Sequence, residues 1–238
     1  MIRRVPVYLV CSPHARVGTS TTARLLADYH RVENRAVRAF DTDPYGLSLS
    51  GFFAGESTVA DLSTTRGQIA LFDRLLLPGE ETRIVDIWNR SYRQFFSQAQ
   101  DIGFFEEADR LDLSPIIVFG TDGSDFSVAS ARELKRAWPD LQMIVVSNEG
   151  AVPLGDDEPS ALQYFLDERT FQISALDPIM RRQLEQPGFS LSDFLVGPPQ
   201  SMSLVVRADL RNWVRRVFAQ FQSYELRNAL DETRYLLR

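Results

Sequence analysis

Lysine is almost absent from this 238-residue sequence, because all but one of its 26 basic residues are arginine and Lys135 is the single lysine. Cysteine is as rare: Cys11 stands alone, which excludes an internal disulfide framework and favours a reducing cytoplasm. No stretch approaches the roughly 20 apolar residues that a membrane span requires. The short apolar run from Val5 to Val10 leads directly into a polar loop, which favours a first strand over a signal peptide. We therefore expect a cytoplasmic protein without a transmembrane segment.

The acidic balance of the chain limits its partners. The formal net charge is −6, and the content of 44% hydrophobic and 24% charged residues is ordinary for a globular protein. A net negative charge excludes nucleic-acid binding by the surface as a whole, whereas a local basic patch stays open. The length predicts a single domain over residues 1–238, with a core at about 5–180 and a C-terminal helical part at 181–238.

Short apolar runs alternate with amphipathic stretches along most of the chain, which predicts a parallel sheet flanked by helices. Several runs are unbroken series of Ile, Val and Phe, as expected for strands that are buried on both faces. The expected strands are 5–11, 35–41, 83–88, 114–120, 142–148 and 169–174. The expected helices are 19–30, 90–111, 127–138 and 159–168, followed by a long C-terminal helix from about 204. The predicted fold class is therefore α/β, with a doubly wound parallel sheet and a C-terminal helix.

The segment Ser12–Ala23, with the sequence SPHARVGTSTTA, has the outline of a phosphate-binding loop. An apolar run precedes it, small residues fill the bend, and hydroxyl residues open the helix that follows. Backbone N–H groups at such a helix N-terminus bind anions, and the Ser20 hydroxyl could bind Mg²⁺. A simpler alternative is that the run from Thr19 to Thr22 only caps the helix, a role that Ser and Thr fill well.

Carboxylates lie at the ends of two further expected strands or directly after them. Asp41 and Asp43 lie in the segment FDTDPYG, and Asp86 lies in RIVDIW. Because open parallel sheets bind ligands at the carboxyl ends of their strands, we expect these groups beside the loop, where they could serve a metal ion. Alternatively, Asp41 and Asp43 are turn residues before Pro44. Asp86 needs a partner in its apolar strand, either an arginine or a metal-bound water.

The order of these pieces resembles the ParA/MinD-like deviant Walker A family of P-loop ATPases, which belongs to the SIMIBI class. The family's loop runs lysine, glycine, glycine, any residue, glycine, lysine, and threonine or serine. Here Gly18 and Ser20 match the last glycine and the hydroxyl residue, and both lysines are replaced. The resemblance extends over about residues 5–180 and implies a P-loop NTPase-like fold, ATP or ADP with Mg²⁺, and a homodimer. The residues that it places around the nucleotide are His14, Ala15, Arg16, Val17, Gly18, Thr19, Ser20 and Thr21.

The resemblance also implies roles for residues outside the loop. Asp43 would orient the attacking water, Asp41 would support the metal site together with Ser20, and Asp86 matches the Walker B aspartate. Asn148 falls where the family commonly has an asparagine that reads adenine. The alternative for Asn148 is that it only ends its strand and begins a turn.

The two lost lysines change the chemistry that the resemblance implies. His14 stands at the lysine that reaches across the family's dimer, and Thr19 stands at the lysine that neutralises the β- and γ-phosphates. Histidine is shorter than lysine and mostly neutral at pH 7. Arg16 could supply a charge, but it occupies a glycine position. Because phosphoryl transfer depends on such charges, we expect ATP hydrolysis that is weak or lost.

A group of arginines lies near the start of the C-terminal helix. It predicts either a solvated helix face or a docking surface for DNA or for an acidic protein. The end of the same helix contains Asp231 and Glu232, which argues against binding to a membrane surface. The arginines are Arg207, Arg211, Arg215 and Arg216.

These patterns predict a ParA/MinD-like nucleotide-binding protein or pseudo-ATPase. It would position or partition a cargo, either DNA or a protein assembly, through dimerisation and partner binding. One alternative is an active, slow, Mg²⁺-dependent ATPase. Another is a DNA-binding module that uses the arginine helix and needs no nucleotide, in which case binding should weaken steeply with salt.

Overall fold

The structure is a computed structural model that describes residues 4–45, 48–53, 55–151, 163, 165 and 169–236, with the side chains of the last helix up to Asp231. The chain divides into two compact units, Met1–Ala175 and Leu176–Arg238, and each is described by itself. The boundary lies close to residue 181, where the sequence predicts the start of the C-terminal helical part. The single domain over 1–238 stays a prediction.

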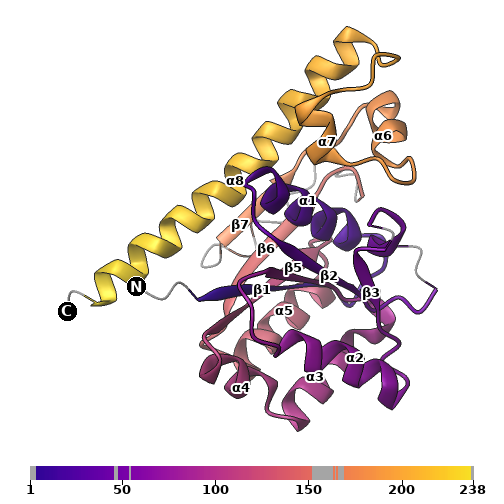
Figure 1. Cartoon of the computed structure of the whole chain (residues 1–238). Coiled ribbons are helices and arrows are strands. Elements are labelled where there is room, and N and C mark those ends of the chain that lie inside the picture. The colour runs from indigo at the N-terminus through magenta and orange to yellow at the C-terminus, as the bar shows by residue number, and fades with distance from the viewer. Residues whose placement is uncertain are drawn as a thin grey trace. The chain divides into compact units, whose positions relative to one another are not determined.

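The first unit is built on a seven-stranded sheet in which all neighbouring strands are parallel (Figure 1). The strand order is β3-β2-β4-β1-β5-β6-β7, so the chain winds outward in both directions from β1. This confirms the predicted α/β class. The strands are β1 Val5–Cys11, β2 Val37–Asp41, β3 Ser57–Val59, β4 Thr82–Asp86, β5 Leu113–Thr121, β6 Gln142–Asn148 and β7 Arg169–Ile173.

Helices cover both faces of this sheet, with α1 on the opposite side from α2, α3 and α4 (Figure 1). The side of α2 to α5 contains a large hydrophobic core, in which rings such as Phe72, Phe95 and Phe104 pack against the sheet residues Leu9 and Phe119. The helices are α1 Thr19–Val32, α2 Thr65–Leu75, α3 Tyr92–Asp101, α4 Phe104–Arg110 and α5 Asp125–Ala137, with short 3-10 helices η1 Leu49–Gly51 and η2 Asn89–Ser91.

The predicted secondary structure differs from the observed one in the helices and in one short strand. The expected single helix over 90–111 is wrong, since it is divided into α3 and α4 at Gly103, whose φ of 64° is left-handed and ends α3. The sequence patterns also missed β3, which has only three residues, and α2. The expected helix over 159–168 lies almost entirely outside the described residues.

The second unit consists of α6 Pro178–Leu184, α7 Leu191–Val196 and α8 Leu204–Leu236. Asp177 and Ser190 cap the first two helices, because their side chains accept hydrogen bonds from the backbone N–H groups of Ile179 and Asp193. The predicted long C-terminal helix is confirmed as α8. No helix within the described residues is both long and apolar enough to cross a membrane.

Candidate functional site

The sheet topology brings the predicted site residues to one edge. In the strand register, Asp86 of β4 stands beside Val10 of β1 on one side and beside Asp41 of β2 on the other. The loop that follows β1 therefore begins next to the carboxyl ends of β2 and β4. This is the edge at which open α/β sheets bind their ligands.

The loop between β1 and α1 keeps a bend that glycine normally provides. Arg16 has a φ of 65° and Gly18 has a φ of 85°, so both are left-handed. An arginine in this conformation costs on the order of 1 kcal/mol, and the loop nevertheless adopts it at the position where the family pattern has glycine. Ala15 and Arg16 are both exposed. The loop therefore keeps its left-handed bend with the side chain of Arg16 exposed to solvent.

The N-terminus of α1 has no side-chain cap. Its N-cap is Gly18, and within the described part of the chain no side-chain cap hydrogen bond forms at this end of the helix. Thr22 instead donates its hydroxyl to the Gly18 carbonyl at 3.0 Å. Thr19 to Thr22 therefore do not provide the cap, and ligand binding by this loop stays a prediction. N–H groups at the start of a 14-residue helix stay available to an anion.

Asn148, at the end of β6, packs directly against the loop. A Cβ atom built on Gly18 would lie 2.2 Å from the Nδ2 atom of Asn148, so only glycine fits beside this side chain. The Oδ1 atom of Asn148 accepts a hydrogen bond from the Gly150 N–H group at 3.1 Å. Asn148 thus holds the loop against β6, and its role in reading adenine stays a prediction.

Gly120 of β5 provides the floor beneath the loop. A Cβ atom at this position would lie 3.1 Å from Cγ2 of Val17 and 3.4 Å from Cγ2 of Thr19. Thr19, which replaces the phosphate-gripping lysine, therefore sits with its methyl group near β5. Gly120 was not predicted as a site residue, although a glycine inside an apolar strand is a known sign of close backbone approach.

Cys11 forms the base of the loop as the last residue of β1. It is completely buried, and this burial raises the pKa of its thiol far above the usual range. The thiol is therefore protonated and has no access to solvent in the folded protein. Its position supports packing beneath the loop and gives no reactive group to the site.

Asp41 is fully occupied by hydrogen bonds from its own chain. Its Oδ1 atom accepts the backbone N–H of Asp43 at 2.9 Å and the hydroxyl of Ser48 at 2.8 Å, and its Oδ2 atom accepts the N–H of Ser50 at 2.9 Å. Asp43 in turn accepts the N–H of Tyr45 at 3.0 Å. These contacts organise the segment after β2. Sequence reasoning missed Ser48 and Ser50 because they follow at a spacing that no motif sets.

Asp86 has a different environment. It is 2% exposed, and within hydrogen-bond geometry neither of its carboxylate oxygens has a partner among the described residues. Burial and the nearby charge of Asp41 raise the pKa of its carboxyl group to about 7, while Ser20, Ser48 and the backbone of Leu49 lie near enough to oppose this increase. A buried carboxylate that its neighbouring donors do not reach with hydrogen-bond geometry needs a cation or a water molecule beside it.

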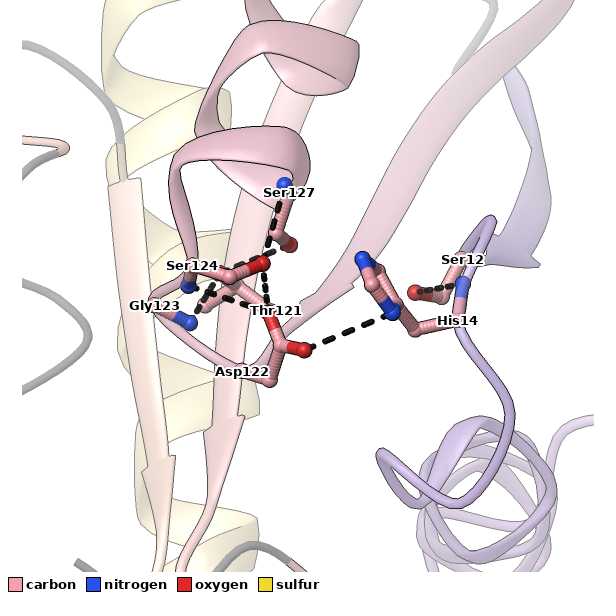
Figure 2. Close-up of polar contacts among 7 residues, drawn as sticks. All are labelled: Ser12, His14, Thr121, Asp122, Gly123, Ser124 and Ser127. Atoms are coloured by element: carbon pink, nitrogen blue, oxygen red, sulfur yellow. Dashed lines mark hydrogen bonds and ion pairs between the residues drawn. The ribbon is translucent and has the colours of Figure 1, made fainter.

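His14 turns toward the segment that follows β5. Figure 2 shows its Nδ1 atom facing Asp122, with 3.5 Å between Nδ1 and Oδ2. Its ring also meets the ring of Phe126 edge-on, with 5.0 Å between centroids. The Nε2 atom of His14 is buried and has no described partner. The histidine that replaces the first lysine is therefore held by residues of its own subunit.

Asp122 is in turn held by the start of α5. It accepts hydrogen bonds from the backbone N–H of Ser124 at 3.1 Å and from its hydroxyl at 2.7 Å (Figure 2). Burial opposes the effect, but these bonds and the charge of His14 together lower the pKa of the Asp122 carboxyl group. Ser124 also caps α5 through the N–H of Ser127. The sequence analysis missed Asp122 because its partner lies on a distant loop.

The arginines of α8 lie in the second unit and differ in exposure. Arg207 and Arg211 are half-buried, and Arg207 donates a hydrogen bond to the carbonyl of Gln200. Arg215 and Arg216 are exposed. The row that the sequence predicts is therefore uneven, and only its last two members are exposed. Across the described residues, no group of three or more His, Cys, Asp or Glu side chains could hold a metal ion by itself.

The comparisons with known proteins concern the fold. No protein-family model matches the sequence, and no curated protein matches it. The structure is similar to a nucleotide-binding protein from Archaeoglobus fulgidus in complex with ADP, with a TM-score of 0.52 and 14% identity over 79% of this chain and 88% of that one. It also aligns with a ParA family ATPase from Chlorobium tepidum TLS, with a TM-score of 0.41 and 14% identity over 89% of this chain and 97% of that one. At 14% identity, the likeness to the Archaeoglobus fulgidus protein shows a shared fold, which in this chain is built on a parallel α/β sheet.

Proposed function

We propose that this chain is a ParA-like nucleotide-binding protein that holds ATP or ADP with Mg²⁺ at the carboxyl edge of its sheet. The observation that carries the proposal is the buried carboxylate of Asp86, whose oxygens have no partner within hydrogen-bond geometry among the described residues. This carboxylate lies near Ser20, at the start of the uncapped helix α1. A free carboxylate and free N–H groups of one helix start suit a cation and an anion that arrive together.

The residues of the site fit such a ligand. The N–H groups of the loop and of the first turn of α1 would hold phosphate oxygens, with Ser20 and Asp86 on the side of the Mg²⁺ ion. When bound, Mg²⁺ would supply positive charge that neutralises the phosphates. Asn148 keeps the loop in place from the opposite side through its contact with Gly18. None of these contacts comes from a lysine, so the loss of both lysines does not remove them.

We further propose that hydrolysis is weak or lost. Thr19 has no charge, and His14 faces Asp122 and Phe126 in the same chain. The two positions that carry lysine in the resembled family thus provide no cation to the developing charge on the phosphate. Removal of such a contact commonly lowers the rate by orders of magnitude. The bound nucleotide would then maintain a conformation and would turn over slowly or not at all.

The role in the cell is also a proposal. We propose that the conformation set by the bound nucleotide controls homodimer formation and partner binding. Such control suits a protein that positions or partitions DNA or a protein assembly. The support is the loop, the Asp41–Asp43 segment and Asp86 in the order of the resembled family. The exposed Arg215 and Arg216 offer a surface for an acidic partner in the second unit.

Calorimetry with ATP and ADP, with and without Mg²⁺, tests the proposal together with a turnover assay. We expect micromolar binding that depends on Mg²⁺, weakens in Ser20→Ala and Asp86→Asn, and is unchanged in Asp73→Asn. Asp73 is an exposed carboxylate on α2 and serves as the matched control. Absence of binding with and without Mg²⁺ would refute the proposal. Steady Mg²⁺-dependent hydrolysis that Asp43→Ala abolishes would establish the slow ATPase instead.

A further inference from the structure

A groove lies between α3 and α5. It is a groove of about 540 Å³ lined by residues of both helices and by Pro13, the residue before His14. Phe96 of α3 and Trp138, which directly follows α5, form part of its apolar lining, with 5.4 Å between their ring centroids. None of the residues assigned to the nucleotide lines this groove. The proposed function therefore leaves it unexplained.

The two walls of the groove carry opposite charges. Arg93 projects from α3 and Glu133 from α5, and both are exposed and line the groove. Neither forms an ion pair or a hydrogen bond with any residue in the described part of the chain. The charge of Glu133 raises the pKa of the Tyr92 hydroxyl and the charge of Arg93 lowers it, so both side chains lie near Tyr92 in the groove. The groove thus presents one free cation and one free anion on facing walls.

An exposed aromatic ring stands at the same place. Phe126 on the first turn of α5 is 51% exposed and lines the groove, and its inner side contacts the ring of His14. A large ring that is half in water beside an apolar groove favours an occupant that covers it. The face therefore combines an apolar projection, an apolar recess and two charges of opposite sign.

We propose that this face binds a second copy of the chain through a two-fold axis that runs along the groove. Such an axis sets the α3 wall of one copy against the α5 wall of the other, so that Arg93 of each copy meets Glu133 of the second copy. The arrangement pairs both charges, whereas a partner with charge of a single sign would leave one of them unpaired in the interface. It also lets the exposed Phe126 ring of each copy pack against the start of the other copy's α3.

This association needs no bound nucleotide. The groove adjoins the loop, since Pro13 lines it and Phe126 contacts His14, but neither Asp86 nor Asn148 lines it. We expect weak association, in the micromolar range. The inference goes beyond the proposed function, and it holds whether or not a nucleotide binds.

Sedimentation velocity of the full chain without nucleotide, over a range of micromolar concentrations, tests the inference by charge exchange. Arg93→Glu and Glu133→Arg should each raise the dimer dissociation constant by about tenfold, because each places like charges opposite one another twice. The double variant Arg93→Glu/Glu133→Arg restores opposite charges in the symmetric dimer, and its dissociation constant should return to within about threefold of wild type. Arg132→Glu, an exposed change on α5 outside the groove, should leave the constant unchanged.

Three results would overturn the inference. The first is a wild-type chain that stays monomeric at every concentration, and the second is a dimer that none of the charge changes weakens. The third is a double variant that dimerises as weakly as the single variants. Recovery is expected only if Arg93 of one copy lies opposite Glu133 of the other. Circular dichroism of each variant confirms that it is folded, and a dimer that forms only with Mg²⁺ and ATP reports the nucleotide site instead.

Discussion

Asp86→Asn should make the protein more stable at high pH, although it removes a group of the proposed site. Burial raises the pKa of this carboxyl group from 3.8 to about 7. At about 1.4 kcal/mol for each pKa unit, the folded state is destabilised by about 4 kcal/mol once the group is ionised in both states. The loss begins as pH rises above the unfolded value of 3.8 and is complete above about 7. Asparagine has nearly the same shape and carries no charge, so it avoids this cost.

Urea unfolding of both proteins at pH 5 and pH 8, in buffer with EDTA, measures the effect. The wild type should carry a cost of about 2 kcal/mol at pH 5 and about 4 kcal/mol at pH 8. The advantage of Asp86→Asn over wild type should therefore grow by roughly 2 kcal/mol between these pH values. This growth does not depend on what the amide itself contributes. Addition of Mg²⁺ and nucleotide at pH 8 should reduce the advantage, because a ligand that binds only the wild type stabilises it.

The comparison between pH values also shows how the reasoning could fail. If the advantage of Asp86→Asn is the same at pH 5 and at pH 8, the carboxyl group does not titrate between them and is not destabilised by burial. If Asp86→Asn is less stable than wild type at pH 8, the carboxylate has a stabilising partner in the folded protein. Asp73→Asn, at an exposed position, should show no pH-dependent difference.

Three further predictions concern the loop and the arginine helix. Arg16→Gly should stabilise the protein by up to about 1 kcal/mol in thermal unfolding, because glycine adopts a left-handed φ without strain; Ala15→Gly, at a position without positive φ, should not, and equal effects would contradict the argument. The double variant His14→Lys/Thr19→Lys should raise ATP affinity at least about tenfold in calorimetry, because the loop keeps its bend and gains charged phosphate contacts. Unchanged affinity would mean that the bend does not admit the phosphates. If α8 binds DNA, Arg215→Ala/Arg216→Ala should weaken binding in fluorescence anisotropy and reduce the slope of its salt dependence by about two, and a salt-independent signal would exclude this surface.

Most strands could be predicted because their sequences contain short apolar runs that become buried in the sheet. β1 and β6 match their predicted bounds, and the other predicted strands differ at their ends by a residue or two. The three residues of β3 are too few for a pattern, so its position depends on pairing with β2. The helix pattern over 90–111 continued across Gly103, where the left-handed backbone ends α3. Periodicity does not reveal such an interruption.

The candidate site could be predicted only in outline. The loop, Asp41 and Asp86 were placed together by the rule that parallel strands end at one edge, and the register confirms this. The partners of individual side chains could not be predicted, since they depend on contacts between distant segments. His14 faces Asp122, and Gly18 lies against Asn148. These pairs decide which groups are free to meet a ligand.

The buried thiol of Cys11 at the end of β1 can be used to measure local opening of the packing beneath the loop. Because Cys11 is the single cysteine and is fully enclosed, a thiol reagent can react with it only while the packing beneath the loop is transiently open. The rate of modification, divided by that of the unfolded chain, gives the fraction of time that this segment spends open. Ligands that close the loop will slow the reaction, so their binding can be followed without introducing a probe residue.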